Sequence, residues 1–224
     1  MGRRFAREGF QVALVRRRHG DELSELCAEI EKSGGRARGF EVDARREEEV
    51  VSLFERVEKE MGPIEVVVIN PGANINIPIR DMTSRKFFKV WEMACFAGFL
   101  VGREAARAMV PRQKGTILFT GATASLRGGS GFAAFASAKA GLRAVAQSMA
   151  RELGPEGIHV AHVVVDGAID MPWIRENFGE ELAKRGPDAM LAPDEIAETY
   201  WAIHAQRRSA WTFEVDLRPW IEKW

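Results

Sequence analysis

The chain has few cysteines, no excess of charge of either sign and no long apolar run. Its two cysteines, Cys27 and Cys95, fall in apolar helical stripes, which favours buried thiols in a reducing compartment. The 32 basic and 32 acidic side chains cancel, so no electrostatic field favours a nucleic acid or an anionic membrane as a partner. No apolar run is as long as a membrane span, and the first residues, with arginines at positions 3, 4 and 7, lack the apolar core of a signal peptide. We therefore expect a cytoplasmic protein.

The sequence also lacks internal repeats, low-complexity segments and any stretch that resembles a linker. Its 224 residues, of which 46% are hydrophobic, are enough to bury a substantial core. We therefore expect one domain over residues 1–224.

The most informative stretch runs from Gly115 to Leu153. Residues 116–120 are a short run of β-branched and aromatic residues, typical of a buried parallel strand. The loop at 121–131 has almost no side-chain bulk, so a ligand can approach its backbone closely. From 132 to 153 apolar residues recur at helical spacing, and Gly154-Pro155 ends the pattern. A strand, a glycine-rich loop and a helix in this order mark the edge at which α/β sheets bind their ligands.

Strands and helices alternate along the rest of the chain. Short apolar runs predict the strands, and apolar residues at helical spacing predict the helices. The expected strands cover residues 11–15, 39–42, 65–69, 116–120, 158–165 and 211–217, and the expected helices cover residues 21–32, 50–61, 83–108, 132–153 and 193–204. This alternation predicts an α/β fold with a doubly wound parallel sheet.

Three motifs of the chain belong to one known pattern. Asn70-Pro71-Gly72-Ala73 follows one strand, Val165-Asp166-Gly167 follows another, and Lys139 lies in the helix after the glycine loop. With this layout the chain resembles the short-chain dehydrogenase/reductase family over essentially its whole length. The resemblance implies a Rossmann-type single domain that transfers a hydride between a nicotinamide cofactor and a small carbonyl or alcohol substrate. It also implies a substrate lid at residues 173–186.

Most of the catalytic positions that the resemblance implies are replaced. The family's helix carries Tyr-x-x-x-Lys with a Ser thirteen residues before the Tyr; here Lys139 is present, Phe135 stands at the Tyr position and Ala122 at the Ser position. The family's fourth catalytic residue, an Asn three residues before a Gly, falls on Cys95 if Gly98 is that glycine. Phe135 has no proton to give, and general acid–base catalysis is typically worth about 10²–10⁴ in rate. The sequence therefore predicts an impaired proton relay.

Three nearby hydroxyls are candidates for the missing proton donor. Ser137 lies about 200° around the helix from Phe135, whereas Lys139 returns to within about 40° of it, so Ser137 faces the wrong way. Thr123 and Ser125 are better surrogates, because both lie in the loop after the strand. The sequence alone does not place their hydroxyls.

Arginines follow the strand at 11–15. In the family, an acid at this strand end binds the ribose of NAD, whereas a basic residue accommodates the 2′-phosphate of NADP. Arg16 occupies the acid's position and Arg17 the usual basic one, so the resemblance implies NADP. The alternative is a solvated arginine cluster ahead of a helix. Asp43, after the next strand, resembles the family's adenine-contacting Asp, but an Asp there also suits capping of the following helix.

The turn after the strand at 65–69 implies further cofactor contacts. Asn70 and Gly72 match in kind the family's Asn-Asn-Ala-Gly turn beside the adenosine ribose, although Pro71 removes a backbone donor. In the family the helix lysine also binds the cofactor, and this role falls on Lys139.

The segment 166–171 stands where the family has Pro-Gly-x-x-x-Thr, which covers the nicotinamide. Within it we expect Ile169 to contact the cofactor. Asp166 replaces the Pro and Met171 replaces the Thr, so the segment departs from the family at both ends.

The family's first strand and glycine-rich turn have no counterpart in this sequence. Residues 3–8, followed by Gly9, are typical of the last turns of a helix with its glycine cap. In the family, a strand and a T-G-x-x-x-G-x-G turn precede such a segment and hold the cofactor pyrophosphate. Without them the strands at 11–15 and 65–69 have unpaired edges. Either these two strands pair directly, or the sequence is a shortened version of a longer product, and we favour the second explanation.

The helices at 83–108 and 132–153 place apolar positions on one side of the sheet, where members of the family usually associate. We therefore expect a homodimer or homotetramer. His159 and His162 are three residues apart on a strand and so lie on opposite faces, and we expect no metal site.

Two functions stay open at this point. The first is an NADP-linked short-chain oxidoreductase with an impaired relay, and the second is a non-catalytic dimeric member that binds or regulates a partner. Lys139 and the small-residue loop favour the first, whereas Phe135 and Ala122 favour the second.

Overall fold

The structure is a computed structural model that describes residues 1–72 and 74–222. Ala73, the last residue of the turn motif, lies outside the described residues. All six strands pair in parallel, so the predicted α/β fold with parallel strands is confirmed. The strands are β1 (Gln11–Arg16), β2 (Arg36–Glu41), β3 (Val66–Ile69), β4 (Gly115–Ala122), β5 (Ile158–Val165) and β6 (Glu214–Leu217).

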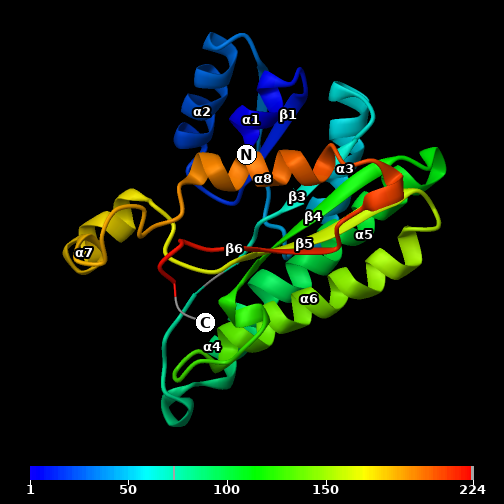
Figure 1. Cartoon of the computed structure of the whole chain (residues 1–224). Helices are drawn as coiled ribbons and strands as arrows, with labels where there is room; N and C mark the ends of the chain where they lie inside the picture. Colours follow the sequence, from blue (N-terminus) through cyan, green and yellow to red (C-terminus); the bar gives the residue numbers. More distant parts are fainter. Residues whose placement is uncertain (73, 223–224) are drawn as a thin grey trace.

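The strands form two sheets, β1-β2 and β3-β4-β5-β6 (Figure 1). Within the described residues β1 pairs with β2 and β3 pairs with β4, so β1 and β3 do not pair with each other. Of the two explanations that the sequence left open, direct pairing of these two strands, the less favoured one, is therefore wrong. One edge of each sheet remains unpaired where the two sheets approach.

Eight α-helices are present in the described chain, and several carry the predicted end signals. They are α1 (Gly2–Arg7), α2 (Gly20–Lys32), α3 (Glu47–Met61), α4 (Ser84–Trp91), α5 (Ala97–Met109), α6 (Ala133–Leu153), α7 (Pro172–Ala183) and α8 (Pro193–His204). Gly9 adopts a left-handed φ of 87° after α1, and the Thr83 hydroxyl caps α4 by accepting from the N–H of Lys86 at 3.2 Å. None of the helices in the described chain is both long and apolar enough to cross a membrane.

The expected continuous helix at 83–108 is interrupted. A single π-helical turn, Glu92–Phe96, separates α4 from α5. The expected strand at 39–42 begins earlier, at Arg36, and the last strand begins later than expected, at Glu214. β2 has only one buried side chain, that of Phe40, so its first half carries no apolar run that the sequence pattern could detect.

Helices cover both faces of the four-stranded sheet (Figure 1). Successive residues of β4 point to opposite faces: Ile117 and Phe119 enter the core beneath α3, α5 and α6, whereas Leu118 enters the core beneath α1 and α8. α3 also packs on β2 through Leu53 and Val57. α3 on one face and α1 with α8 on the other therefore connect the two sheets across the unpaired edges.

Candidate functional site

The candidate site lies where β4 and β5 end. Ala122, the last residue of β4, pairs with Val165, the last residue of β5. A 3₁₀ turn, Thr123–Ser125, follows β4 and packs against α6 as well as against both strands. Ligands of open parallel sheets bind beyond the carboxyl ends of the strands, so this edge is the expected place for chemistry.

Lys139 projects from α6 into the interior and is only 5% exposed. Its ammonium donates to the main-chain oxygen of Thr120 at 2.7 Å, and burial lowers the pKa of this amine to about 8. Gly72 lies against it, because a Cβ at Gly72 would be 3.6 Å from both Cε and Nζ. The structure therefore brings together two of the predicted cofactor-binding residues, from α6 and from the turn after β3.

Two predicted catalytic positions, Phe135 and Ala122, lack hydroxyls. Phe135, one turn before Lys139, is half-buried and packs on a small apolar cluster that includes Val90 and Ala94 of the neighbouring helix region. Ala122 is half-buried, and its N–H donates to the Ser125 hydroxyl at 3.1 Å. Neither side chain can exchange a proton with a substrate.

Cys95 lies in the π-helical turn and is buried. Its sulfur would be 2.9 Å from a Cβ at Gly141, so the thiol fills the contact between the π turn and α6. Burial raises the pKa of the Cys95 thiol, which keeps it protonated and unreactive near neutral pH.

The single tyrosine of the chain, Tyr200, is not a substitute for the missing phenol. It belongs to α8 and is fully buried, and its hydroxyl is 2.7 Å from the Thr120 hydroxyl. Burial raises the pKa of Tyr200, so its phenol resists ionisation and has no path to a bound substrate.

The structure places the three hydroxyls that the sequence left open. Ser137 is exposed and donates to the main-chain oxygen of Ala134 at 2.9 Å. Ser125 is 4% exposed, and its hydroxyl accepts the N–H of Ala122. The Thr123 hydroxyl, in contrast, donates to Oδ1 of Asp166.

Asp166, the first residue after β5, is a charged group whose contact with Thr123 the sequence did not predict. It is 3% exposed, and its Oδ2 has no hydrogen-bond donor among the described residues. Guanidinium nitrogens of Arg127 and Arg218 stand 3.7 Å and 4.0 Å from that oxygen. The contact with Thr123 spans 43 positions of the chain, so no local pattern could have indicated it.

His162 is buried beneath the same edge. Its Nδ1 is 2.9 Å from Glu214, which in turn accepts two hydrogen bonds from Arg143 at 2.6 and 2.7 Å. Burial lowers the pKa of His162, so the ring is neutral at pH 7. His159 stacks instead on Trp211, and no cluster of metal-ligating side chains occurs among residues 1–72 and 74–222.

The predicted adenosine end lies after β1 and β2. Arg16 is ion-paired with Glu22, whereas Arg17 is exposed and close enough to Asp43 to lower its pKa. Asp43 makes a two-pronged contact with the Arg45 guanidinium, which is the main reason that the pKa of this carboxyl falls to about 2.

The interpretation of Asp43 as a helix cap is wrong. α3 begins at Glu47, and its N-cap residue, Arg46, makes no capping hydrogen bond through its side chain. Asp43 accepts the N–H of Arg45 at 3.2 Å, two residues on, which closes a turn ahead of the helix.

The remaining predicted contacts are separate from this group. Asn70 is exposed at the end of β3. Ile169 forms an isolated parallel bridge with Leu191 and packs against the core beneath α8. The cofactor roles of both residues stay predictions.

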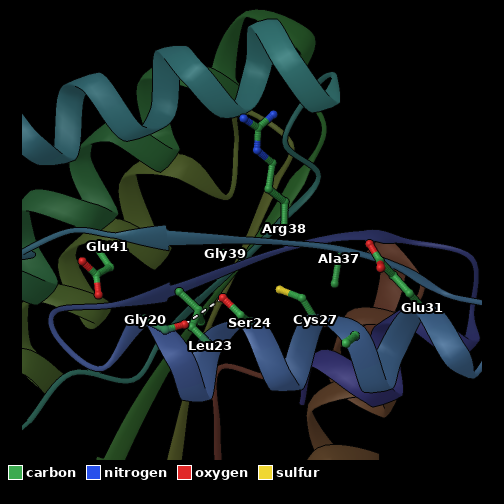
Figure 2. Close-up of a pocket in the computed structure, with 10 residues that line it drawn as sticks. Gly20, Leu23, Ser24, Cys27, Glu31, Ala37, Arg38, Gly39 and Glu41 are labelled. Atoms are coloured by element: carbon green, nitrogen blue, oxygen red, sulfur yellow. Dashed lines mark hydrogen bonds between the residues drawn. The ribbon is translucent and has the colours of Figure 1, made fainter.

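A hollow of about 390 Å³ lies elsewhere, between α2 and β2 (Figure 2). Figure 2 shows Leu23, Ser24 and Cys27 of α2 facing Ala37 and Gly39 of the strand. None of the residues that line it is a predicted site residue. It is a surface groove at the outer edge of the two-stranded sheet and is separate from Lys139.

The chain is similar in sequence to known dehydrogenases and reductases. A family model described as short chain dehydrogenase matches residues 1–182. The chain is 30% identical over 140 residues to 2-dehydro-3-deoxy-D-gluconate 5-dehydrogenase of Formosa agariphila, covering 62% of this chain and 53% of that protein. It is 31% identical over 175 residues to the 3-oxoacyl-[acyl-carrier-protein] reductase MabA of Mycobacterium tuberculosis, covering 78% and 66%. The matches thus span between half and two thirds of these relatives' own lengths.

Solved structures share the fold along nearly all of the chain. A short-chain dehydrogenase from Rhodopseudomonas palustris is 51% identical, with a TM-score of 0.82 over 98% of this chain and 91% of that one. A metagenomic short-chain oxidoreductase in complex with NADP is 23% identical, with a TM-score of 0.82 over 97% and 90%, which shows a common fold. The family match over residues 1–182, the parallel α/β fold and the retained helix lysine agree, and the chain belongs to the short-chain dehydrogenase/reductase family.

Proposed function

We propose that this chain is an NADP-linked oxidoreductase that acts on a small carbonyl or alcohol substrate without the phenol its family normally uses. Membership of the family supports redox chemistry, and the curated relatives are named as a dehydrogenase and a reductase. The fold neighbour solved with NADP supports the cofactor class. When bound, NADP supplies or accepts the hydride, and the residues of this chain must hold the substrate and move the proton.

The observation that carries the proposal is the burial of Lys139. An ammonium has three donors, and among the described residues Lys139 uses one of them, toward Thr120. Burying a charge is costly unless it is compensated by hydrogen bonds. Ribose hydroxyls of a bound dinucleotide are acceptors for the other two donors, and Gly72 leaves room for a ligand backbone or sugar beside the amine. The residues present therefore fit the nicotinamide-ribose end of the cofactor.

The residues after β1 fit the other end. Arg17 is exposed and makes no ion pair in the described chain, so its guanidinium is available to a 2′-phosphate. Arg16 contributes less, because Glu22 already neutralises it. This arrangement supports NADP over NAD.

Phe135 and Ala122 lower the expected rate. A lost general acid costs about 10²–10⁴ in turnover, and residues that act as a unit do not add. We therefore expect slow turnover compared with enzymes that keep the phenol, and the substrate identity stays open.

A screen of NADPH oxidation tests the proposal. Ethyl acetoacetate, cyclohexanone and 5-keto-D-gluconate serve as carbonyl probes at millimolar NADPH, with Lys139→Ala as the disabled variant and Lys114→Ala as the matched control. Lys114 is exposed and paired with Glu65 at 2.8 Å, so its loss should leave turnover unchanged. Turnover that disappears in Lys139→Ala alone supports the proposal, and turnover that survives it contradicts the assigned site.

A second candidate is a non-catalytic dimeric binding or regulatory member, which the loss of hydroxyls at Phe135 and Ala122 favours; one surface feature is compatible with both candidates. Four aromatic rings along α4, the π turn and α5 stack in a row with centroids 6.1–6.2 Å apart: Phe88, Trp91, Phe96 and Phe99. Two of them are large exposed apolar side chains, with 59% exposure for Phe88 and 39% for Phe99. Such a row suits a homodimer or homotetramer interface in either function.

The free thiols of Cys27 and Cys95 support our placement of the protein in the cytoplasm.

A further inference from the structure

Thr123 and Asp166 form a hydroxyl–carboxylate pair at the edge where β4 and β5 end. Thr123 directly follows Ala122, the position at which the family has a hydroxyl. Asp166 directly follows Val165, the strand partner of Ala122. Thr123 and Asp166 therefore each lie one residue after the last paired residues of β4 and β5, at the carboxyl end of the sheet where ligands bind.

The two members of the pair differ in access to solvent. Thr123 is half-buried, whereas Asp166 is only 3% exposed. A bound molecule can thus reach the hydroxyl but not the carboxylate. This order, a reachable hydroxyl backed by a buried carboxylate, is the arrangement that general-base catalysis through a hydroxyl requires.

The hydrogen-bonding capacity of Asp166 is only partly used. Its Oδ1 accepts from Thr123, but its Oδ2 has no hydrogen-bond donor among the described residues. The guanidinium nitrogens of Arg127 and Arg218, at 3.7 and 4.0 Å, are too distant for hydrogen bonds. Buried carboxylate oxygens are normally satisfied, so an unsatisfied one at a ligand-binding edge calls for a functional explanation.

The other polar groups near the edge are committed elsewhere. Ser125 accepts the N–H of Ala122 and is buried, and Tyr200 is fully buried against Thr120. Lys139 donates to Thr120 from the buried side of α6. Thr123 is the half-buried residue of the 3₁₀ turn whose hydroxyl contacts a carboxylate, that of Asp166.

We propose that Thr123 is the residue that exchanges the proton with the substrate oxygen, and that Asp166 accepts that proton through Thr123; the inference rests on the oxidoreductase function proposed above. In alcohol oxidation, the carbinol C–H bond breaks and its electron pair leaves as hydride to the oxidised nicotinamide. The substrate O–H proton passes to Thr123 Oγ1 as the Thr123 proton passes to Oδ1 of Asp166, and the C=O bond forms. The proton then leaves Asp166 for solvent, and reduction follows the same steps in reverse.

The test introduces a phenol at position 135, where the family has its catalytic Tyr and this chain has Phe135. Asp166→Asn keeps the shape and the acceptor for Thr123 but removes the base, and Phe135→Tyr supplies the ordinary proton carrier in its place. The two changes are made singly and together in the full chain. Oxidation of ethyl 3-hydroxybutyrate, cyclohexanol and D-gluconate with millimolar NADP is followed by NADPH absorbance.

The proposal predicts a conditional effect. Asp166→Asn should lower turnover about 100-fold in the wild-type background, and should change it little in the Phe135→Tyr background. Thr123→Val should match Asp166→Asn, and Thr123→Ser, which keeps the hydroxyl, should retain turnover.

Asp216→Asn is the matched control. Asp216 is a carboxylate on β6 that pairs with the same Arg218 but does not contact Thr123, so its loss should leave turnover unchanged. NADPH affinity by tryptophan fluorescence and the unfolding temperature, measured on every variant, separate a proton-transfer role from damage to the fold. Both quantities should be the same in Asp166→Asn as in the wild type.

Each other outcome overturns the proposal. An equal loss in the wild-type and Phe135→Tyr backgrounds would show that Asp166 is structural, and no loss in either would show that it takes no part. A wild type that is inactive while Phe135→Tyr is active would refute both the Thr123–Asp166 pair and the proposal that this chain turns over without the phenol, whereas an active wild type that Asp166→Asn leaves unchanged would refute the pair alone. Inactivity of both would refute the proposed function itself, and the pair with it.

Discussion

The ammonium of Lys139 and the phenol of Tyr200 meet on one residue: Lys139 donates to the main-chain oxygen of Thr120 at 2.7 Å, and the hydroxyl of Tyr200 is 2.7 Å from the side-chain hydroxyl of Thr120. Thr120 thus joins α6 on one face of the sheet to α8 on the other. This double contact fixes the lysine near the carboxyl end of β4, where the proposed chemistry takes place.

Burial of Lys139 makes a prediction about stability and pH. Its pKa falls from 10.5 to about 8 in the folded protein. Between those values the unfolded chain binds the proton and the folded protein does not, so stability should rise as pH increases from about 8 to 10.5, by up to about 3 kcal/mol. Urea unfolding of the wild type at pH 7 to 10 should show this rise, and Lys139→Met should lack it. Parallel curves for the two proteins would contradict the assignment of a buried lysine that titrates in the folded state.

Gly121 makes a second prediction. A Cβ at this position would collide with the ring of His162 and lie 3.0 Å from the Ser125 hydroxyl. His162 is held by Glu214 and cannot withdraw, so Gly121→Ala should destabilise the protein by about 1–3 kcal/mol. Gly128→Ala, in the loop that follows, is the control, because its Cβ would meet only Ala136 at 4.0 Å, and its effect should be within about 0.5 kcal/mol of zero. Equal denaturation midpoints for the two variants would refute this packing.

Much of this fold follows from local sequence patterns. β5 and α8 have the predicted bounds, because a run of β-branched residues defines the first and Pro193 with two acids defines the start of the second. β2 begins three residues earlier than expected, since its arginines at 36 and 38 hide the strand from an apolar pattern. Its pairing with β1, not its own composition, makes it a strand.

The site was harder to predict than the fold. Lys139 and Gly72 were found through their motifs, but the pairing of Thr123 with Asp166 and of Tyr200 with Thr120 joins residues 43 and 80 positions apart. Such contacts depend on strand order and register, which local periodicity does not encode. The π-helical turn at Glu92–Phe96 likewise left no signal in the apolar spacing.

The aromatic row of Phe88, Trp91, Phe96 and Phe99 makes a prediction about assembly. We expect a dimer or tetramer at micromolar concentration by light scattering, and we expect Phe88→Glu with Phe99→Glu to shift it toward the monomer, because both side chains are exposed on the row. Phe178→Glu, at a 46% exposed aromatic residue of α7, is the control and should not change the mass. A monomeric wild type would contradict this interface.

β1 and β3 each have an unpaired edge, where the family has a further strand followed by the glycine-rich turn that holds the cofactor pyrophosphate. This arrangement predicts a low affinity for NADPH. Micromolar binding requires about 8 kcal/mol, and charge-assisted hydrogen bonds from Arg17 supply only about 1.5–3 kcal/mol each. We therefore expect this 224-residue chain to bind NADPH more weakly than micromolar. A strand and glycine-rich turn fused ahead of Met1 should tighten binding far more than Phe135→Tyr does. A Gly/Ser extension of equal length is the control, and micromolar binding by the unextended chain in a tryptophan-fluorescence titration would contradict the account.

The central claim is that a hydride passes from NADPH to a carbonyl substrate at the site around Lys139. It is tested most directly by following the hydride itself. NADPH carrying deuterium at the transferable C4 position is incubated with the wild type and with Lys139→Ala in the presence of the carbonyl probes, and the products are examined by mass spectrometry. The account predicts one deuterium on the carbinol carbon with the wild type and none with Lys139→Ala. Deuterium that reaches no product with the wild type, or reaches it equally with Lys139→Ala, would contradict it.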